Sequence, residues 1–190
     1  MDDAAWEAVT DTLTAERLAL RGKELVYATD KLQFLLKRVP GRVAAVAESG
    51  SRLTATNIER LVEAFGDQEE AFAVGLEKLR YVAPVFRMRP SEAGFEGFNH
   101  ACSHYNYSIC AGDFSAVVVC STGDFFVYAG SPRFVRSALG QDLSDSFSTL
   151  DNYIRRFPTE DSRLMLNSVL VAIRDEFPVA ADGSWVTFPK

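Results

Sequence analysis

The chain has 190 residues, of which 47% are hydrophobic and 24% are charged. This length and this balance are typical of a globular domain that buries a core, and they exclude an intrinsically disordered chain. The net charge of −6 at pH 7 favours solubility and disfavours a broad phosphate-binding surface, so we expect no nucleic-acid partner.

The cysteines and the termini carry no signal for export. Three cysteines are an odd number and do not form a disulfide framework. We find neither the charged start and apolar centre of a signal peptide nor an apolar run near the ~20 residues of a membrane span. We therefore expect a soluble cytoplasmic protein with reduced thiols and no membrane partner.

The beginning of the chain reads mainly as helix. Asp2 and Asp3 precede spaced apolar residues, which predicts an acidic helix start. Apolar positions from Leu18 to Leu36 predict either one long helix or two shorter pieces. Residues 43–47 fit a short strand as well as a helical turn.

Two more helices carry start and stop signals. Thr56 and Glu59 form a capping-box pattern before an apolar face, and Gly66 stands where a C-terminal cap belongs. Residues 67–70 repeat this pattern. We therefore predict a second helix that begins at 67 and reaches Val82.

The clearest strand signal lies in the second half of the chain. Residues 114–120 and 125–129 are almost continuously hydrophobic and are joined by a Ser-Thr-Gly-Asp turn, which predicts an antiparallel hairpin covered on both faces. A strand within 102–110 extends this sheet, and 185–188 is a further candidate strand. Residues 85–89 lie between two prolines, which favours an edge strand.

Three helices are predicted after the hairpin. Ser131 and Pro132 begin the first helix, and Gly140 ends it. Pro158 ends the second helix, and Thr159 begins the third.

These elements predict an α+β fold in which a small antiparallel sheet packs against helices from both ends of the chain. We expect a single domain over 1–190. Its helical N-terminal part covers about 1–83, and the sheet with the C-terminal helices covers about 85–190. Both histidines and all three cysteines lie in the second part.

Four residues have the donor types of a zinc site: His100, Cys102, His104 and Cys110. On a strand the first three would share a face, whereas on a helix only the two histidines would. Cysteine is also commonly buried as a small hydrophobic residue, and the cluster has no Cys-x-x-Cys pair. A zinc-binding protein is therefore our alternative hypothesis.

A cysteine enzyme is the other chemical alternative. Cys110 is followed by Asp113, and two histidines lie upstream, so a base and an orienting group are near in sequence. No family signature surrounds Cys110, and Cys120 lies inside an apolar strand, where we expect it in the core. The sequence has no phosphate-binding loop and no dinucleotide fingerprint.

The leading hypothesis is a binding protein. Tyr105, Asn106 and Tyr107 form an aromatic and polar set typical of recognition surfaces. Arg133 and Arg136 belong to a basic concentration that could contact a ligand. We predict a non-catalytic protein-binding domain without a cofactor, of the inhibitor or immunity type, whose acidity suits a basic protein partner.

Overall fold

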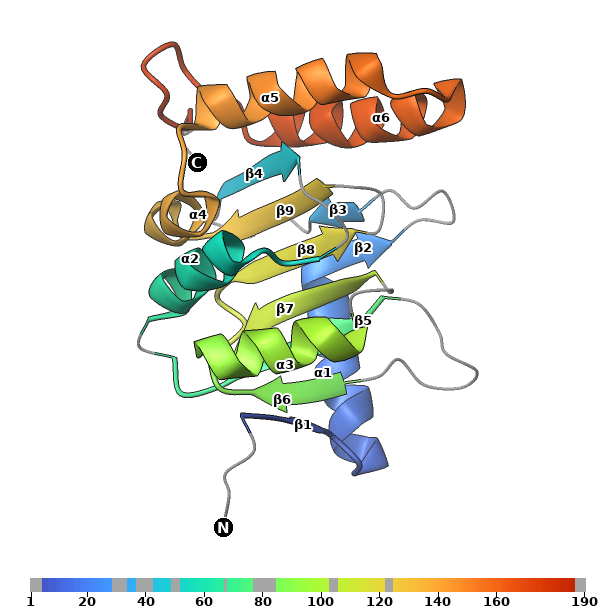
Figure 1. Cartoon of the computed structure of the whole chain (residues 1–190), viewed down its shortest axis with the longest axis vertical. Helices are drawn as coiled ribbons and strands as arrows, with labels where there is room; N and C mark the ends of the chain where they lie inside the picture. Colours follow the sequence, from blue (N-terminus) through green and yellow to red (C-terminus); the bar gives the residue numbers. More distant parts are fainter. Residues whose placement is uncertain are drawn as a thin grey trace.

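An antiparallel sheet of seven strands forms the centre of the fold, with helices on both faces and beyond one edge (Figure 1). The computed structural model describes residues 5–28, 34–36, 43–48, 52–66, 68–76, 85–102, 106–121 and 125–186. The strands are β1 (Trp6–Ala8), β4 (Val43–Glu48), β5 (Ala71–Gly75), β6 (Val85–Met88), β7 (Tyr107–Ala111), β8 (Val117–Ser121) and β9 (Phe125–Gly130). Their order across the sheet is β1-β6-β5-β7-β8-β9-β4. The predicted α+β fold is therefore confirmed.

The predicted hairpin is confirmed as β8 and β9, although β8 begins at Val117 and not at 114, and the strand expected within 102–110 is confirmed as β7. The sheet is larger than expected, because β1 and β5 come from residues that were predicted to be helical, and β4 is the strand that was one of two alternatives for residues 43–47. A separate antiparallel pair consists of β2 (Val26–Ala28) and β3 (Phe34–Leu36). The prediction for 85–89 was right about the strand, but β6 lies between β1 and β5 and not at the edge.

The helix predicted from 67 to Val82 was wrong, because β5 occupies Ala71–Gly75. All five residues of β5 are buried, and β5 pairs with β6 on one side and β7 on the other. A strand buried on both faces shows a continuous apolar run, so its hydrophobic residues also match helical spacing.

The helix predicted from Asp2 and Asp3 was also wrong. Residues 1–4 lie outside the described part, and β1 follows. The first helix, α1 (Thr12–Leu25), begins after Asp11, whose carboxylate accepts a hydrogen bond from the Thr14 N–H at 2.8 Å. Hydrogen bonds from the side chain and the backbone of Thr14 hold the pKa of the Asp11 carboxyl below its usual range.

The remaining helices are α2 (Ala55–Phe65), α3 (Glu92–Cys102), α4 (Pro132–Leu139), α5 (Leu143–Arg156) and α6 (Glu160–Glu176). The three helices predicted after the hairpin are thus confirmed. The capping box of α2 is formed by Thr54 and Asn57 in place of the predicted Thr56 and Glu59, while Gly66 is the C-cap as expected. Among the described helices, none has the length and hydrophobicity needed to cross a bilayer.

Helices α2, α3 and α4 cover one face of the sheet, and α1 covers part of the other (Figure 1). We call these the α3 face and the α1 face. Tyr107 belongs to the α3 face, because its ring contacts Phe98 of α3 edge-on at 4.7 Å between centroids. Phe72 and Val74 belong to the α1 face, because Val74 packs against Gly22 of α1 and alternate strand residues share a face.

Two glycines allow α3 to lie directly on the first strand. A Cβ atom at Gly97 would lie 2.3 Å from Trp6 Nε1, and one at Gly94 would lie 2.2 Å from the carbonyl oxygen of Arg89. Both distances are too short for any side chain, so the close approach requires glycine. Glycine also lowers helix propensity, which explains why the sequence pattern alone did not indicate this helix.

The outer edge of β4 is covered by side chains from the end of the chain. Ser146 of α5 donates a hydrogen bond to the Val46 carbonyl at 2.5 Å, and Trp185 Nε1 donates one to the Ala44 carbonyl at 3.0 Å. Trp185 forms an isolated bridge with Val179, and residues 187–190 of the candidate strand 185–188 lie outside the described part. An exposed strand edge is a site of unwanted pairing, and these two donors protect it.

The Ser146→Ala variant should lower the free energy of unfolding by about 1–3 kcal/mol, because it removes a fully buried donor and leaves the Val46 carbonyl without that partner. Denaturant titration followed by circular dichroism measures the change. Ser148→Ala, an exposed serine on the same helix, is the control and should change the value by less than about 0.5 kcal/mol. Equal effects of the two substitutions would contradict this role of Ser146.

Candidate binding surface

The sheet separates two of the four predicted metal ligands. His100 is an exposed residue in the last turn of α3. Cys110 lies on the opposite, α1 face, because it is paired with Phe72 in the register of β5 and β7. His100 and Cys110 therefore cannot bind the same ion.

The other two candidate ligands lie at the edge of what the structure describes. Cys102 is the last residue of α3, and its side chain is outside the described part, as is the whole of His104. Among described residues, no three His, Cys, Asp or Glu side chains are grouped closely enough to hold a metal ion. A zinc site that uses His100 with Cys102 and His104 stays a prediction.

The two described thiols lie inside the sheet. Cys110 and Cys120 are both buried, and the Sγ atom of Cys110 is 3.9 Å from Ser108 Oγ. Burial raises the pKa of the Cys120 thiol to about 12, and a hydrogen bond with Tyr107 opposes this only in part. Cys120 is therefore protonated at neutral pH, and its expected place in the core is confirmed. A nucleophilic cysteine needs the thiolate, which this environment disfavours.

Two of the predicted surface residues are in the core. Asn106 and Tyr107 are buried, and residue 105 lies outside the described part. The correction has a simple cause: Tyr107 begins β7, which is a central strand covered by α3, whereas an aromatic and polar sequence is equally compatible with an exposed strand. Tyr107 therefore acts in packing, through its edge-on contact with Phe98.

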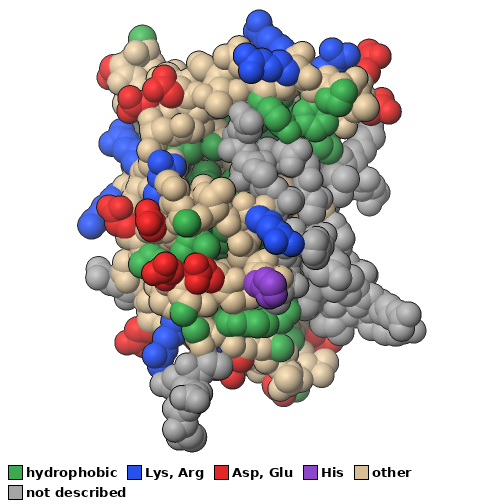
Figure 2. All heavy atoms as spheres, in the orientation of Figure 1, with side chains coloured by type: hydrophobic (Ala, Val, Ile, Leu, Met, Phe, Trp, Pro, Cys, Tyr) green, Lys and Arg blue, Asp and Glu red, His purple; other side chains and the backbone are tan. Residues whose placement is uncertain are grey.

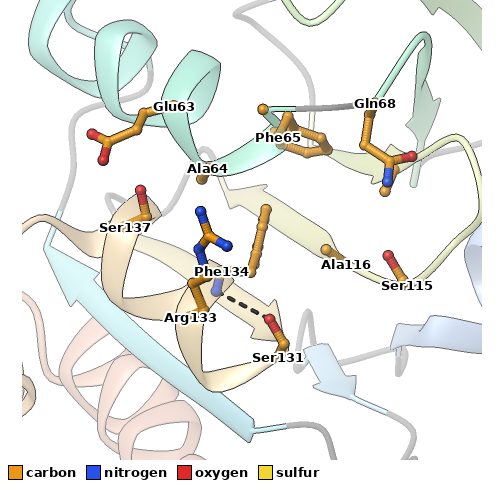
Figure 3. A pocket seen from close by; sticks show the side chains of 12 residues that line it. Glu63, Ala64, Phe65, Gln68, Ser115, Ala116, Ser131, Arg133, Phe134 and Ser137 are labelled. Atoms are coloured by element: carbon orange, nitrogen blue, oxygen red, sulfur yellow. Dashed lines mark hydrogen bonds between the residues drawn. The ribbon is translucent and has the colours of Figure 1, made fainter.

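Arg133 lies at the rim of a pocket between the end of α2, the start of α4 and the turn between β7 and β8 (Figure 3). The pocket has a volume of about 380 Å³. Phe65 and Phe134 form an apolar wall, with ring centroids 5.2 Å apart in an edge-on contact. Glu63 and Arg133 place opposite charges on the two helices that border the pocket. The pocket could hold a polar side chain, and it gives Arg133 a position where a ligand can reach it.

Arg136 has a structural partner. Its guanidinium lies 5.4 Å from the ring centroid of Trp185, the residue that covers the edge of β4. A cation over an aromatic face is attracted by the ring quadrupole, so Arg136 helps to hold the end of the chain against the sheet. This role does not require a ligand.

Acidic side chains gather on the outer side of α2 and α3 (Figure 2). Glu59 and Glu63 are exposed on α2, and Glu92 and Glu96 are exposed on α3. Each pair has the i, i+4 spacing that places both side chains on one side of a helix. We call these four residues the acidic helix face.

One side chain fixes the two helices of the acidic helix face relative to each other. Asn99 of α3 accepts a hydrogen bond from the N–H of Leu53 and donates one to its carbonyl, both at 2.9 Å. Leu53 directly precedes the capping residue of α2. The rings of Phe65 and Phe95 add a contact between the helices, with centroids 5.7 Å apart. The four carboxylates are thus presented by a pre-organised pair of helices.

Sequence reasoning missed this surface. From the sequence, Glu59 was assigned to a capping box, and α3 was not predicted. Without a predicted helix, the i, i+4 spacing of Glu92 and Glu96 did not indicate that the two side chains share one side. The available signal was Ser91 before Glu92, since Ser91 Oγ accepts a hydrogen bond from the Gly94 N–H at 3.2 Å, as an N-terminal cap does. Gly94 and Gly97 lower the helix propensity of the residues that follow Ser91, so the cap alone did not predict a helix.

Comparison with known proteins adds no assignment. The chain matches none of the protein-family models, curated proteins or solved structures with which it was compared. The function must therefore be inferred from the geometry of the surface itself.

The thiols of Cys110 and Cys120 should resist alkylation in the folded protein at pH 8, because both are buried and the pKa of Cys120 is raised to about 12. Mass spectrometry after iodoacetamide treatment, with and without denaturant, measures the modification of each cysteine. Full protection until unfolding is the expected result. Rapid modification of Cys120 in the native state would contradict the burial described above.

Proposed function

We propose that the protein is a non-catalytic protein-binding domain, of the inhibitor or immunity type, that binds a basic partner through the acidic helix face. The observation that carries this proposal is the exposure of four carboxylates on two helices that Asn99 and the Phe65–Phe95 contact hold in one arrangement. The net charge of −6 acts in the same direction.

Electrostatic attraction suits a protein of this type. Complementary charge accelerates the encounter of two proteins and suppresses wrong partners, even where it adds little to the final affinity. A surface that is already ordered loses little conformational entropy on binding. The acidic helix face combines both properties, so a basic surface on the partner can dock without rearrangement of α2 and α3.

The placement of the thiols supports a binding role over cysteine catalysis. Cys110 and Cys120 are inside the sheet, and His100 is on the far side of the sheet from Cys110. A cysteine nucleophile needs a base within hydrogen-bond reach. Cys110, the candidate nucleophile, therefore has no access to His100, which is one of the two histidines that the sequence suggested as its base.

The fourfold variant E59Q/E63Q/E92Q/E96Q should lose binding to the basic partner, by about tenfold or more at 0.15 M salt, because each exposed charge contributes a few tenths of a kcal/mol up to about 1 kcal/mol. The wild-type protein and the variant serve as baits in lysate of the native host, and the affinity of each captured protein is measured by biolayer interferometry as a function of salt.

A matched control carries the same change of charge elsewhere. E16Q/D145N/D161N/D175N removes four exposed carboxylates from α1, α5 and α6, outside the acidic helix face. This control should retain the partner, with affinity close to that of the wild-type protein. Equal loss of binding in both variants, or capture of a partner whose interface is acidic, would contradict the proposal.

A further inference from the structure

Among the residues that the structure describes, β1 is the last strand at one edge of the sheet, and its outer side pairs with no other strand. The Val9 N–H donates to the Val85 carbonyl, and the Arg89 N–H donates to the Ala5 carbonyl, at 2.9 and 3.0 Å. In an antiparallel pair the bonding direction alternates from residue to residue. The backbone groups of Trp6 and Ala8 therefore point away from β6, toward the outside of the sheet.

The two edge strands of the sheet, β4 and β1, differ in how far other parts of the chain cover them. At β4, Ser146 and Trp185 donate hydrogen bonds to outward carbonyls, and α5 packs on the strand. At β1, Glu7 and Ala8 are exposed, and α3 lies over one face of the strand without reaching around its edge (Figure 1). An accessible strand edge accepts an extended segment of another chain by main-chain hydrogen bonding.

The charged side chains next to β1 indicate which type of residue an extended segment bound at this edge would carry. Glu7 lies 3.7 Å from Arg87 of β6, and Arg87 also lies 3.3 Å from Glu70. One guanidinium thus serves two carboxylates, so this row of side chains has a net negative charge. Glu7 is the outermost member, and its side chain is 61% exposed. A basic side chain directly opposite Glu7, on a segment bound outside β1, would continue the alternation of negative and positive charge in this row.

The other face of the edge is apolar. Trp6 is partly exposed and points to the α3 face, where its ring contacts Phe86 at 5.6 Å between centroids and packs on Gly97. Residues of an added strand opposite Trp6 and Ala8 would lie on this face. Tryptophan in such a position is a frequent anchor of protein interfaces.

We propose that the edge of β1 binds an extended segment of the basic partner, in which a lysine or arginine opposite Glu7 lies between two apolar residues opposite Trp6 and Ala8. This inference rests on the proposed function, because it takes the partner to be basic. It adds a second contact, at which the partner continues the sheet beyond β1.

A second copy of the chain fits this edge poorly. The antiparallel register that pairs all three residues of β1 with those of another β1 places Glu7 directly opposite Glu7 of the second copy. Like charges in such a position destabilise the pairing, since the two Cβ atoms are about 5 Å apart. A basic segment meets no such repulsion.

The test uses the full chain and a blocked peptide of sequence Thr-Thr-Val-Lys-Val-Thr-Thr as the probe, observed by NMR of the amide groups. We expect the peptide to shift the Trp6 and Ala8 amide signals and to slow their hydrogen exchange. Methylation of both valine nitrogens should abolish binding, because these N–H groups face β1. Methylation of the lysine backbone nitrogen should be tolerated, because its N–H points away from β1.

Two variants test the residues of the edge. A8P removes an outward N–H without removing a bond to β6, and it should weaken binding roughly threefold to tenfold, as the loss of one hydrogen bond predicts. E7K should reverse the charge preference, so that the peptide with glutamate in place of lysine binds about twofold to fivefold more tightly than the lysine peptide. Unchanged circular dichroism shows that each variant is folded.

The outcomes separate this inference from the proposed function. Absence of shifts at β1 with millimolar peptide would overturn the inference, as would shifts that ignore the position of the N-methyl groups. Binding of the lysine peptide only at α2 and α3 would overturn strand addition while supporting the acidic helix face. Formation of a dimer through β1, measured by sedimentation, would assign the edge to a second copy and would also overturn the inference.

Discussion

Complete burial of the central strands is the constraint on which the rest of the structure depends. All residues of β7, β8 and β9 are buried, so both faces of the sheet must be covered by other elements. On one face this requirement brings α2, α3 and α4 together, and Phe65 contacts both Phe95 and Phe134 where they meet. The acidic helix face is a consequence of this packing, since the helices that cover the sheet turn their charged sides outward.

The same constraint determines which elements could be predicted from the sequence. The hairpin was found because Val117–Ser121 and Phe125–Gly130 are apolar runs on either side of a turn signal. Helix α4 was found because Ser131 caps it, with the Phe134 N–H bonded to Ser131 Oγ, and Gly140 ends it in the left-handed conformation. Strand β5 was missed because an apolar run preceded by a capping pattern is compatible with either element. Helix α3 was missed because Gly94 and Gly97, which its contacts with Arg89 and Trp6 require, lower helix propensity.

The site could be predicted less well than the fold, for a related reason. His100 and Cys110 are near in sequence, but α3 ends and β7 begins between them, and this places them on opposite sides of the sheet. Tyr107 has a polar group that suggests a surface, yet the position of β7 places it in the core. The acidic side chains of α2 and α3 come together on one face of the molecule (Figure 2) only because α2 contacts α3. None of these relations is local, so no spacing in the sequence encodes them.

The position of β4 in the sheet has a consequence for how the chain is made. Val43 pairs with Gly130, and Glu48 pairs with Phe125, so an apolar strand that is synthesised early waits for a partner that is synthesised much later. The donors that cover its other edge, Ser146 and Trp185, come later still. Strands that wait unpaired are prone to aggregate. During synthesis the segment Val43–Glu48 therefore needs protection, as by a chaperone, until Phe125–Gly130 has been made.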